Sequence, residues 1–136
     1  MEVFLGGTTA EGTNWREKLI PMLEIDYFNP IVDDWNDEAY KKELEKRETC
    51  DYVLYVITPL MEGYYSIAEV VDDSNKRAEK TILCVLDTDG EGENAKKTWS
   101  KNQKKSWTAI KKMVDDNWGM VLNNLDEVAD YLNGEE

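Results

Sequence analysis

The sequence predicts an α/β protein in which four or five parallel strands form a sheet with helices on both faces. Residues 52–57 and 81–86 carry most of this prediction, because continuous apolar runs are typical of strands that are covered on both faces. Strand-like and helix-like segments also alternate along the chain, and this order indicates parallel strands joined by helices. With 136 residues and no internal repeat, the chain is expected to form a single domain over residues 1–136.

The first half of the chain contains two short strands, each followed by a helix. Residues 3–5 form an apolar run that stops at a glycine-rich turn, and residues 25–28 form the next run. Thr13 is expected to cap the first helix, which Pro21 should kink or shorten. Residues 37–49 carry apolar side chains three and four positions apart and predict the second helix.

The central strand, residues 52–57, leads into the most informative stretch of the chain. Pro59 ends this strand because proline cannot donate a hydrogen bond to a neighbouring strand. Ser66 and Glu69 then form the Ser-x-x-Glu pattern of a capping box, in which each side chain bonds to the backbone of the other residue. The pattern predicts that a helix starts here with a carboxylate at its N-terminus.

The rest of the chain alternates in the same way but contains one weak region. Residues 87–105 have the composition of a mobile loop, which is either a lid or plain disorder. Ser106 is expected to cap the next helix, and residues 119–122 are expected to form a short last strand. Asn124 and Glu127 repeat the capping pattern at the start of a closing helix.

Composition excludes several classes of function. The chain has 29 acidic and 16 basic residues, and its net charge of −13 repels nucleic acid and anionic membranes, so we expect neither as a partner. It has no histidine, which excludes Ser-His-Asp catalysis, Cys-His catalysis and histidine metal sites. We therefore expect no metal and no other cofactor. Acid-base and nucleophilic chemistry is left to carboxylates, tyrosines and lysines.

The two cysteines and the first residues of the chain indicate in which cellular compartment the protein is expected. Cys50 and Cys84 lie in or beside predicted strands, and two cysteines make no disulfide framework, so we interpret them as reduced core thiols. The first residues lack both a basic region and a long apolar run, and no segment has the length of a membrane span. We expect a soluble cytoplasmic protein.

Unusual residues directly follow three of the predicted strands. They are Gly6-Gly7-Thr8, residues 29–35 and residues 58–69. Ligands of parallel sheets bind at the carboxyl ends of the strands, and these ends share one edge. We therefore expect the three segments to converge on one rim.

Trp35 in the second segment and Glu43 in the helix after it each allow two interpretations. Trp35 either covers the edge of the core while Asp33 and Asp34 cap the next helix, or it stacks on a ring-sized ligand that one of the aspartates binds. Glu43 shares a helix face with Arg47, four residues on, and either pairs with it or points into a pocket at the end of the helix.

The rim suits chemistry at the anomeric carbon of a sugar. In such reactions one carboxylate attacks the carbon while another group protonates the departing group, and the transition state resembles an oxocarbenium ion. Glu69, at a helix start near other carboxylates, tyrosines and a tryptophan, is the candidate nucleophile. The alternative is that Glu69 is a capping residue that folds back onto its own helix.

The order and spacing of five stretches resemble a known enzyme family. The stretches are Phe4-Leu5-Gly6-Gly7-Thr8, Trp15-Arg16, residues 27–35, residues 50–59 and residues 63–69. Together they resemble the nucleoside 2-deoxyribosyltransferases, particularly their short bacterial and phage-type relatives. The resemblance covers roughly residues 3–88.

This resemblance implies a flavodoxin-like sheet and a ping-pong exchange of 2-deoxyribose between nucleobases. It implies Glu69 as the nucleophile at C1′ and Glu43 as a second carboxylate near the sugar. The partners would be a nucleoside or nucleotide and a free nucleobase. The resemblance also implies a homo-oligomer in which a neighbouring subunit completes the pocket.

The same resemblance implies which residues bind the substrate. The loop that holds Trp35 would bind the base, and the glycines after the first strand would let the ligand approach the backbone. Gly63 departs from the family, because many members have an aspartate or serine six residues before the nucleophile, and Glu62 beside it is a substitute. The expected substrate-binding residues are Gly6, Gly7, Thr8, Asp33, Asp34, Trp35, Glu62, Gly63, Tyr65 and Ser66.

Two alternative functions use the same pocket. In a nucleotide N-glycosidase, water is the acceptor and a 5′-phosphate is held near a helix N-terminus. In a non-catalytic protein, the pocket binds or sequesters a nucleotide without turnover. The groups that would hold the phosphate are Thr8, Thr9, Thr13, Arg16 and Ser66.

Overall fold

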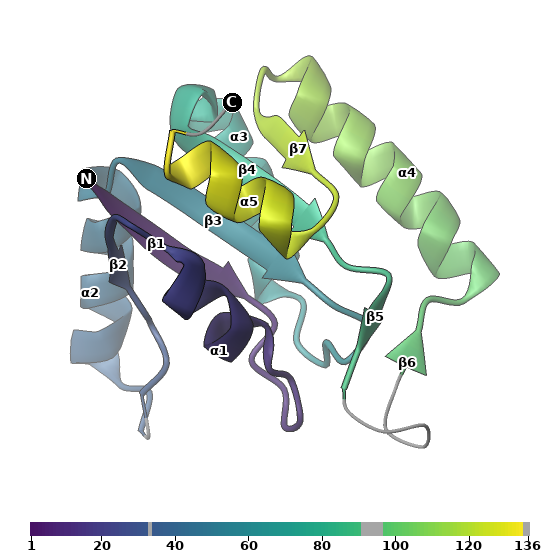
Figure 1. Cartoon of the computed structure of the whole chain (residues 1–136), viewed down its shortest axis with the longest axis horizontal. Coiled ribbons are helices and arrows are strands. Elements are labelled where there is room, and N and C mark those ends of the chain that lie inside the picture. The colour runs from purple at the N-terminus through teal and green to yellow at the C-terminus, as the bar shows by residue number, and fades with distance from the viewer. Residues whose placement is uncertain (33, 91–96, 135–136) are drawn as a thin grey trace.

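Five parallel strands form one sheet in the order β2-β1-β3-β4-β7, and helices cover both of its faces (Figure 1). This arrangement is seen in a computed structural model that describes residues 1–32, 34–90 and 97–134. It is a flavodoxin-like arrangement, so the expected fold class is confirmed. The strands are β1 (Glu2–Gly7), β2 (Asp26–Phe28), β3 (Tyr52–Ile57), β4 (Thr81–Val85) and β7 (Met120–Leu122).

The register of the central strands brings their carboxyl ends to one edge. Gly7 at the end of β1 lies opposite Val56 of β3, and Ile57 at the end of β3 lies opposite Val85 of β4. The loops that follow β1, β3 and β4 therefore leave the sheet side by side. This is the edge at which parallel α/β sheets bind ligands.

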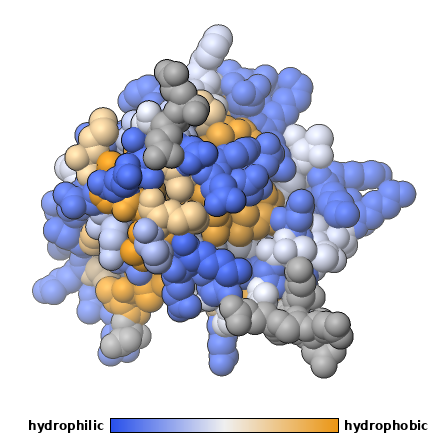
Figure 2. Space-filling model, in the orientation of Figure 1, coloured by the Kyte–Doolittle hydropathy of each residue, from blue (hydrophilic) through white to orange (hydrophobic). Residues whose placement is uncertain are grey.

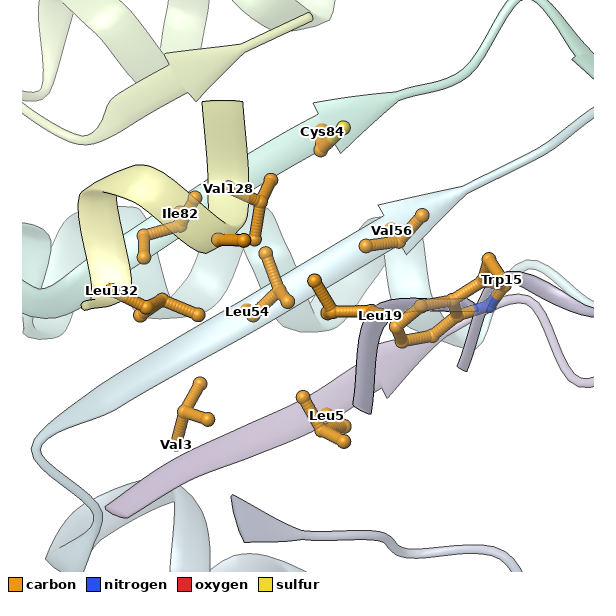
Figure 3. Close-up of a cluster of buried hydrophobic side chains, with 11 residues drawn as sticks. Val3, Leu5, Trp15, Leu19, Leu54, Val56, Ile82, Cys84, Val128 and Leu132 are labelled. Atoms are coloured by element: carbon orange, nitrogen blue, oxygen red, sulfur yellow. The ribbon is translucent and has the colours of Figure 1, made fainter. Parts of the chain in front are cut away.

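One face of the sheet packs against α1 (Trp15–Leu19) and α5 (Leu125–Leu132). Figure 3 shows the apolar side chains of this layer pointing toward one another between the sheet and the two helices. Alternate residues along each strand supply them, because successive side chains point to opposite faces. The buried cluster comprises Val3, Leu5, Trp15, Leu19, Leu54, Val56, Ile82, Cys84, Val128, Ala129 and Leu132.

The opposite face packs against α3 (Tyr65–Lys76) and α4 (Lys101–Asp116). The remaining residues of β1, β3 and β4 point to this side. α2 (Asp37–Thr49) precedes β3 and contacts α3 through the side chain of Arg47. The buried residues of this layer are Phe4, Cys50, Val53, Tyr55, Ile57, Val70, Leu83, Val85, Trp99, Trp107 and Val114.

The two cysteines belong to these layers as expected. Cys50 and Cys84 are both buried free thiols, and burial raises the pKa of each to about 12. At neutral pH neither thiol is a nucleophile, because the reactive thiolate is not populated.

The surface is predominantly polar, as the composition requires. Figure 2 shows hydrophilic residues over much of the face seen in Figure 1, with apolar residues between them. Within the described residues, no helix combines the length and the apolar character that crossing a membrane requires.

The start of the chain follows the prediction except at one helix cap. Pro21 does shorten the first helix: α1 ends at Leu19 and a 3₁₀ turn, Ile20–Met22, replaces its last part. Thr13 is not the N-cap, since Asn14 occupies that position. The hydroxyl of Thr13 instead donates to the carboxylate of Asp89, far along the chain.

The region expected to be a mobile loop contains regular structure at both ends. β5 (Thr88–Asp89) and β6 (Lys97–Thr98) pair antiparallel, and Trp99 beside them is buried with its indole N–H bonded to the carbonyl of Leu86. The expectation of a loop throughout 87–105 is therefore wrong at its two ends. Residues 91–96 lie outside the described residues.

The prediction that Ser106 caps the following helix is wrong. α4 begins at Lys101, and Ser100 forms a complete capping box with Gln103, so Ser106 lies inside the helix. The lysine-rich first turn hid this start. At the last helix the cap at Asn124 is confirmed, because its side chain accepts a hydrogen bond of 2.8 Å from the backbone N–H of Glu127. The reciprocal half of the pattern is not formed, since the Glu127 carboxylate accepts from the backbone N–H of Asn123 instead.

Candidate active site

A cavity of about 930 Å³ opens at the carboxyl edge of the sheet. The end of β1, the loop after β2, one side of α2, and the segment from β3 into α3 form its walls. The three segments expected to converge on one rim therefore do so. The cavity is lined by Gly6, Gly7, Thr8, Trp35, Glu43, Glu62, Gly63, Tyr65, Ser66 and Glu69, among other residues.

Asp34, one of the two aspartates of the predicted site, does not join this lining. Asp34 is exposed and is not among the residues that form the cavity wall. Asp33 lies outside the described residues. The loop contributes apolar groups to the wall instead, through Pro30, Ile31 and Val32.

Glu69 points into this cavity from the first turns of α3. The predicted capping box is wrong: the helix starts at Tyr65, Tyr64 occupies the N-cap position, and no side chain caps this end. Ser66 is consequently inside the helix. Glu69 is 7% exposed and makes no hydrogen bond back to Ser66, so its carboxylate is available to a ligand in the cavity.

Burial and neighbouring charges determine the ionisation of Glu69. Burial raises its pKa to about 7, Arg47 opposes this rise, and Glu43 and Asp73 add to it. The Nη1 atom of Arg47 lies 3.7 Å from the Oε2 atom of Glu69. A carboxylate with a pKa near neutrality is partly ionised at physiological pH, as is common for groups at catalytic sites.

Glu43 faces the cavity from α2 and does not pair with Arg47. Its Oε2 atom accepts a hydrogen bond of 2.8 Å from the indole N–H of Trp35. The ion-pair interpretation of Glu43 is therefore wrong. Arg47 instead forms ion pairs with three acidic residues of α3, at positions 69, 72 and 73.

Trp35 does not cover the edge of the core. Its side chain is 60% exposed, and its ring lies edge-on to the ring of Tyr40 with centroids 5.4 Å apart. Asn36 caps α2 by accepting a hydrogen bond from the backbone N–H of Ala39, so this task does not fall to the aspartates. The core-cover interpretation is wrong, and stacking of a ligand ring on Trp35 stays a prediction.

The loop after β1 is held in place by its own backbone and by β3. The hydroxyl of Thr8 accepts a hydrogen bond of 2.9 Å from the backbone N–H of Thr58. Gly6 and Gly7 are required here for packing: a Cβ atom on Gly6 would lie 2.7 Å from the ring of Tyr55, and one on Gly7 would lie 2.0 Å from the carbonyl oxygen of Val56.

Arg16 is a buried cation at the base of the same loop. Its guanidinium donates to the backbone carbonyls of Leu5 and Thr8, at 2.8 Å and 2.7 Å, and lies over the ring of Trp15. Burial lowers its pKa to about 10, so it remains charged. The carbonyl oxygens of the strand end thus hold Arg16 in place.

The charged side chains in the wall of the cavity are mostly carboxylates. Glu11, Glu43, Glu62 and Glu69 all line it, and Arg16 is the only basic side chain among the described lining residues. An anionic wall stabilises positive charge that develops on a bound group. The site therefore suits a reaction through a cationic transition state.

Sequence reasoning missed the polar cluster behind Glu69, composed of Arg47, Tyr55, Asp73 and Arg77. Asp73 is fully buried and lies one helical turn after Glu69. It accepts hydrogen bonds from both arginines and from the hydroxyl of Tyr55. The available signal was an aspartate at i+4 from the candidate nucleophile, on the face that also carries Val70.

Comparison with known proteins gives one family. Residues 1–88 match the family described as "Nucleoside 2-deoxyribosyltransferase like", which is more than half of the chain. A comparison with curated proteins gives no match. The matched region runs from β1 to the start of β5 and contains every residue of the predicted site, whereas α4, β7 and α5 lie beyond it.

Proposed function

Because the chain belongs to the nucleoside 2-deoxyribosyltransferase-like family, we propose that it transfers a deoxyribosyl group from one nucleobase to another by way of Glu69. The observation that carries this proposal is the position of Glu69, a buried carboxylate that lines the large cavity and makes no hydrogen bond to its own helix. The anionic wall and the exposed ring of Trp35 supply the environment that a sugar and a base require.

The reaction has two displacements at C1′. In the first, a carboxylate oxygen of Glu69 forms a bond to C1′ while the bond from C1′ to the base nitrogen breaks, and the base leaves with that electron pair and takes up a proton. In the second, a nitrogen of another base forms a bond to C1′ while the bond from C1′ to Glu69 breaks, and the incoming base gives up a proton. We assign to Glu43, which lines the cavity from α2, the role of donating the proton to the departing base.

The dependence of activity on pH follows from the pKa of Glu69. Burial raises this pKa to about 7, and only the ionised carboxylate attacks, so kcat/KM should increase with pH and level off above about 7. Initial rates of base exchange measured from acid to mildly alkaline pH check this expectation. A profile that is flat across neutral pH would contradict the assignment of Glu69 as the nucleophile.

Trp35 should contribute to binding of the base and not to stability. Replacing it with alanine is expected to raise the KM for the acceptor base roughly tenfold, because stacking on an aromatic ring is worth about 1–3 kcal/mol. Since Trp35 is 60% exposed, the free energy of unfolding should change by less than about 0.5 kcal/mol.

A matched variant separates the ring of Trp35 from its N–H group. Trp35→Phe keeps a ring for stacking but removes the hydrogen bond to Glu43. Steady-state kinetics with varied acceptor should place its KM near that of the wild type. An equally large rise in KM for both variants would show that the N–H group and Glu43, and not stacking, hold the base.

The nucleotide alternatives require a phosphate site that several contacts oppose. The hydroxyl of Thr13 donates to Asp89, and the guanidinium of Arg16 is bonded to backbone carbonyls. The carboxylates of the wall would also repel a phosphate dianion. These contacts favour a nucleoside over a nucleotide as the donor.

The test of the proposed function is an exchange assay. The protein is incubated with a purine deoxynucleoside and a different free base, and the products are separated by chromatography. A new deoxynucleoside supports transfer. Release of free base without an added acceptor, faster from monophosphates, would replace transfer with N-glycosidase activity, and tight binding in calorimetry without turnover would replace it with sequestration.

We also propose that the protein forms a homo-oligomer. Ile31, Val32, Tyr64 and Tyr65 expose apolar surface on the segments that border the cavity. Apolar groups gathered at one site commonly mark an interface. Sedimentation of the purified protein tests this proposal, and a monomer at micromolar concentration would contradict it.

A further inference from the structure

We propose that Arg47 is the positioning residue that holds the Glu69 carboxylate in its place in the cavity, with Asp73 as the clamp that fixes Arg47. This inference deepens the proposed function and rests on Glu69 being the nucleophile. Its evidence is the way in which one guanidinium divides its contacts among the acidic side chains of α3.

The guanidinium of Arg47 directs its strongest contacts away from Glu69. Its Nε and Nη2 atoms donate to the two oxygens of Asp73 at 3.1 Å and 2.9 Å, and Nη2 also donates to Asp72 at 3.1 Å. The remaining nitrogen, Nη1, faces Glu69 at 3.7 Å. This distance permits charge attraction but is beyond the range of a hydrogen bond.

This distribution of the hydrogen bonds of Arg47 suits a role of Glu69 as a nucleophile. A guanidinium that donated hydrogen bonds to Glu69 would occupy the lone pairs that must attack carbon. Here Arg47 supplies a positive charge beside the carboxylate, whereas the described residues donate no hydrogen bond to Glu69 itself. Arg47 therefore favours the charged form of Glu69 against the effect of burial and leaves its oxygen atoms available to a ligand.

Asp73 fixes the plane of Arg47. Its side chain is fully buried and also accepts hydrogen bonds from the hydroxyl of Tyr55 and from Arg77, four residues on. Two parallel hydrogen bonds to one carboxylate fix a guanidinium in both direction and rotation. A lysine at position 47 would keep the charge but would lose this fixed direction.

Several charged or titratable groups face Glu69, and they come from three elements. α2 supplies Arg47 and Glu43, α3 supplies Asp73 and Tyr65, and β3 supplies Tyr55. Within the described part of the chain, Arg47 is the one cation that forms an ion pair with Glu69. Burial and the two neighbouring carboxylates all favour the protonated form of Glu69, so Arg47 alone opposes them.

A direct titration tests this inference without relying on activity. Protein labelled with ¹³C at the side-chain carboxyl of glutamate is titrated, and the Glu69 resonance is identified by its loss in Glu69→Gln. In Arg47→Gln the midpoint of Glu69 is expected to rise by roughly one pH unit or more, because an opposite charge at this distance lowers the pKa of a carboxyl by about 1–3 units. The acidic limb of the kcat/KM profile should move with it.

Two further variants make the result specific. Arg77→Gln removes another guanidinium that binds Asp73 but forms no ion pair with Glu69, so the midpoint of Glu69 should stay at its wild-type value. Arg47→Lys should lower kcat with little change in KM, because the charge remains while the fixed direction is lost. A folded Arg47→Gln protein with an unchanged Glu69 midpoint would overturn the inference.

The outcomes also separate this inference from the proposed function. If base exchange is absent but Arg47→Gln moves the Glu69 midpoint, the transferase proposal fails and the role of Arg47 stands. If exchange is present and the midpoint does not move, only the role of Arg47 fails. Should Arg47→Gln not fold, Arg47→Lys decides, since an unchanged midpoint together with an unchanged kcat would overturn the inference.

Discussion

Glu69→Gln is expected to lower kcat for base exchange by at least about a thousandfold, because the amide cannot attack C1′. The variant keeps the size of the side chain that lines the cavity, so substrate binding should survive. Chromatographic exchange assays at saturating nucleoside measure the loss, and calorimetry measures binding. Glu45→Gln is the matched control, since Glu45 is an exposed residue of α2 outside the cavity wall and should retain full activity.

The free energy of unfolding of Glu69→Gln should also depend on pH differently from that of the wild type, and this difference distinguishes the variant from a misfolded protein. The folded-state pKa of Glu69 is raised from its ordinary 4.5 to about 7, so between these pH values the folded protein binds more protons than the unfolded chain. The free energy of unfolding of the wild type should therefore fall, relative to Glu69→Gln, as pH rises through this window. Denaturant unfolding at pH 5 and pH 8 measures the difference. Full exchange activity in Glu69→Gln would remove Glu69 as the nucleophile.

Much of the fold could be predicted because its evidence lies within short segments. The continuous apolar runs at 52–57 and 81–86 identified the two central strands, and Pro21 marked the end of the first helix. The same local patterns failed where tertiary structure chose among several caps. Ser66 matches the capping pattern, but α3 begins one residue before it, at Tyr65.

The location of the site was predictable for a topological reason. Parallel strands deliver their following loops to one edge, so Gly6, Trp35 and Glu69 could be assigned to a common rim without knowing any contact between them. Contacts between side chains of different helices could not be predicted in this way. Spacing on one helix suggested that Glu43 pairs with Arg47, whereas Arg47 reaches α3 instead, because Asp73 offers a buried bidentate partner there.

Trp35 illustrates the same limit. A tryptophan in a loop is usually explained by burial, and the residues around Trp35 supported core cover and ligand contact equally. Its 60% exposure and its bond to Glu43 arise from the approach of the loop to α2. The position of α2 depends on contacts outside the loop, such as those of Arg47 with Asp73 of α3, which no pattern in the loop itself encodes.

The second large effect is expected for Gly7→Ala, which should reduce the free energy of unfolding by more than about 3 kcal/mol. Gly7 has a φ of 121°, which is costly for any residue with a Cβ atom. Its Cβ would also lie 2.0 Å from the carbonyl oxygen of Val56, so β1 would have to move away from β3. That movement would also strain the hydrogen bond between Thr8 and Thr58 at the rim of the cavity.

Gly63→Ala is the matched control for this effect. Gly63 also lines the cavity, but a Cβ atom there meets nothing within 4 Å, so its free energy of unfolding should stay within about 0.5 kcal/mol of the wild-type value. Denaturant unfolding of both variants and the wild type measures the contrast. Equal stability of the two variants would contradict the close approach of β1 to β3. Glycine is expected at position 7 because the end of β1 lies against the backbone of β3. This approach leaves Thr8 at the rim of the cavity that Glu69 also lines.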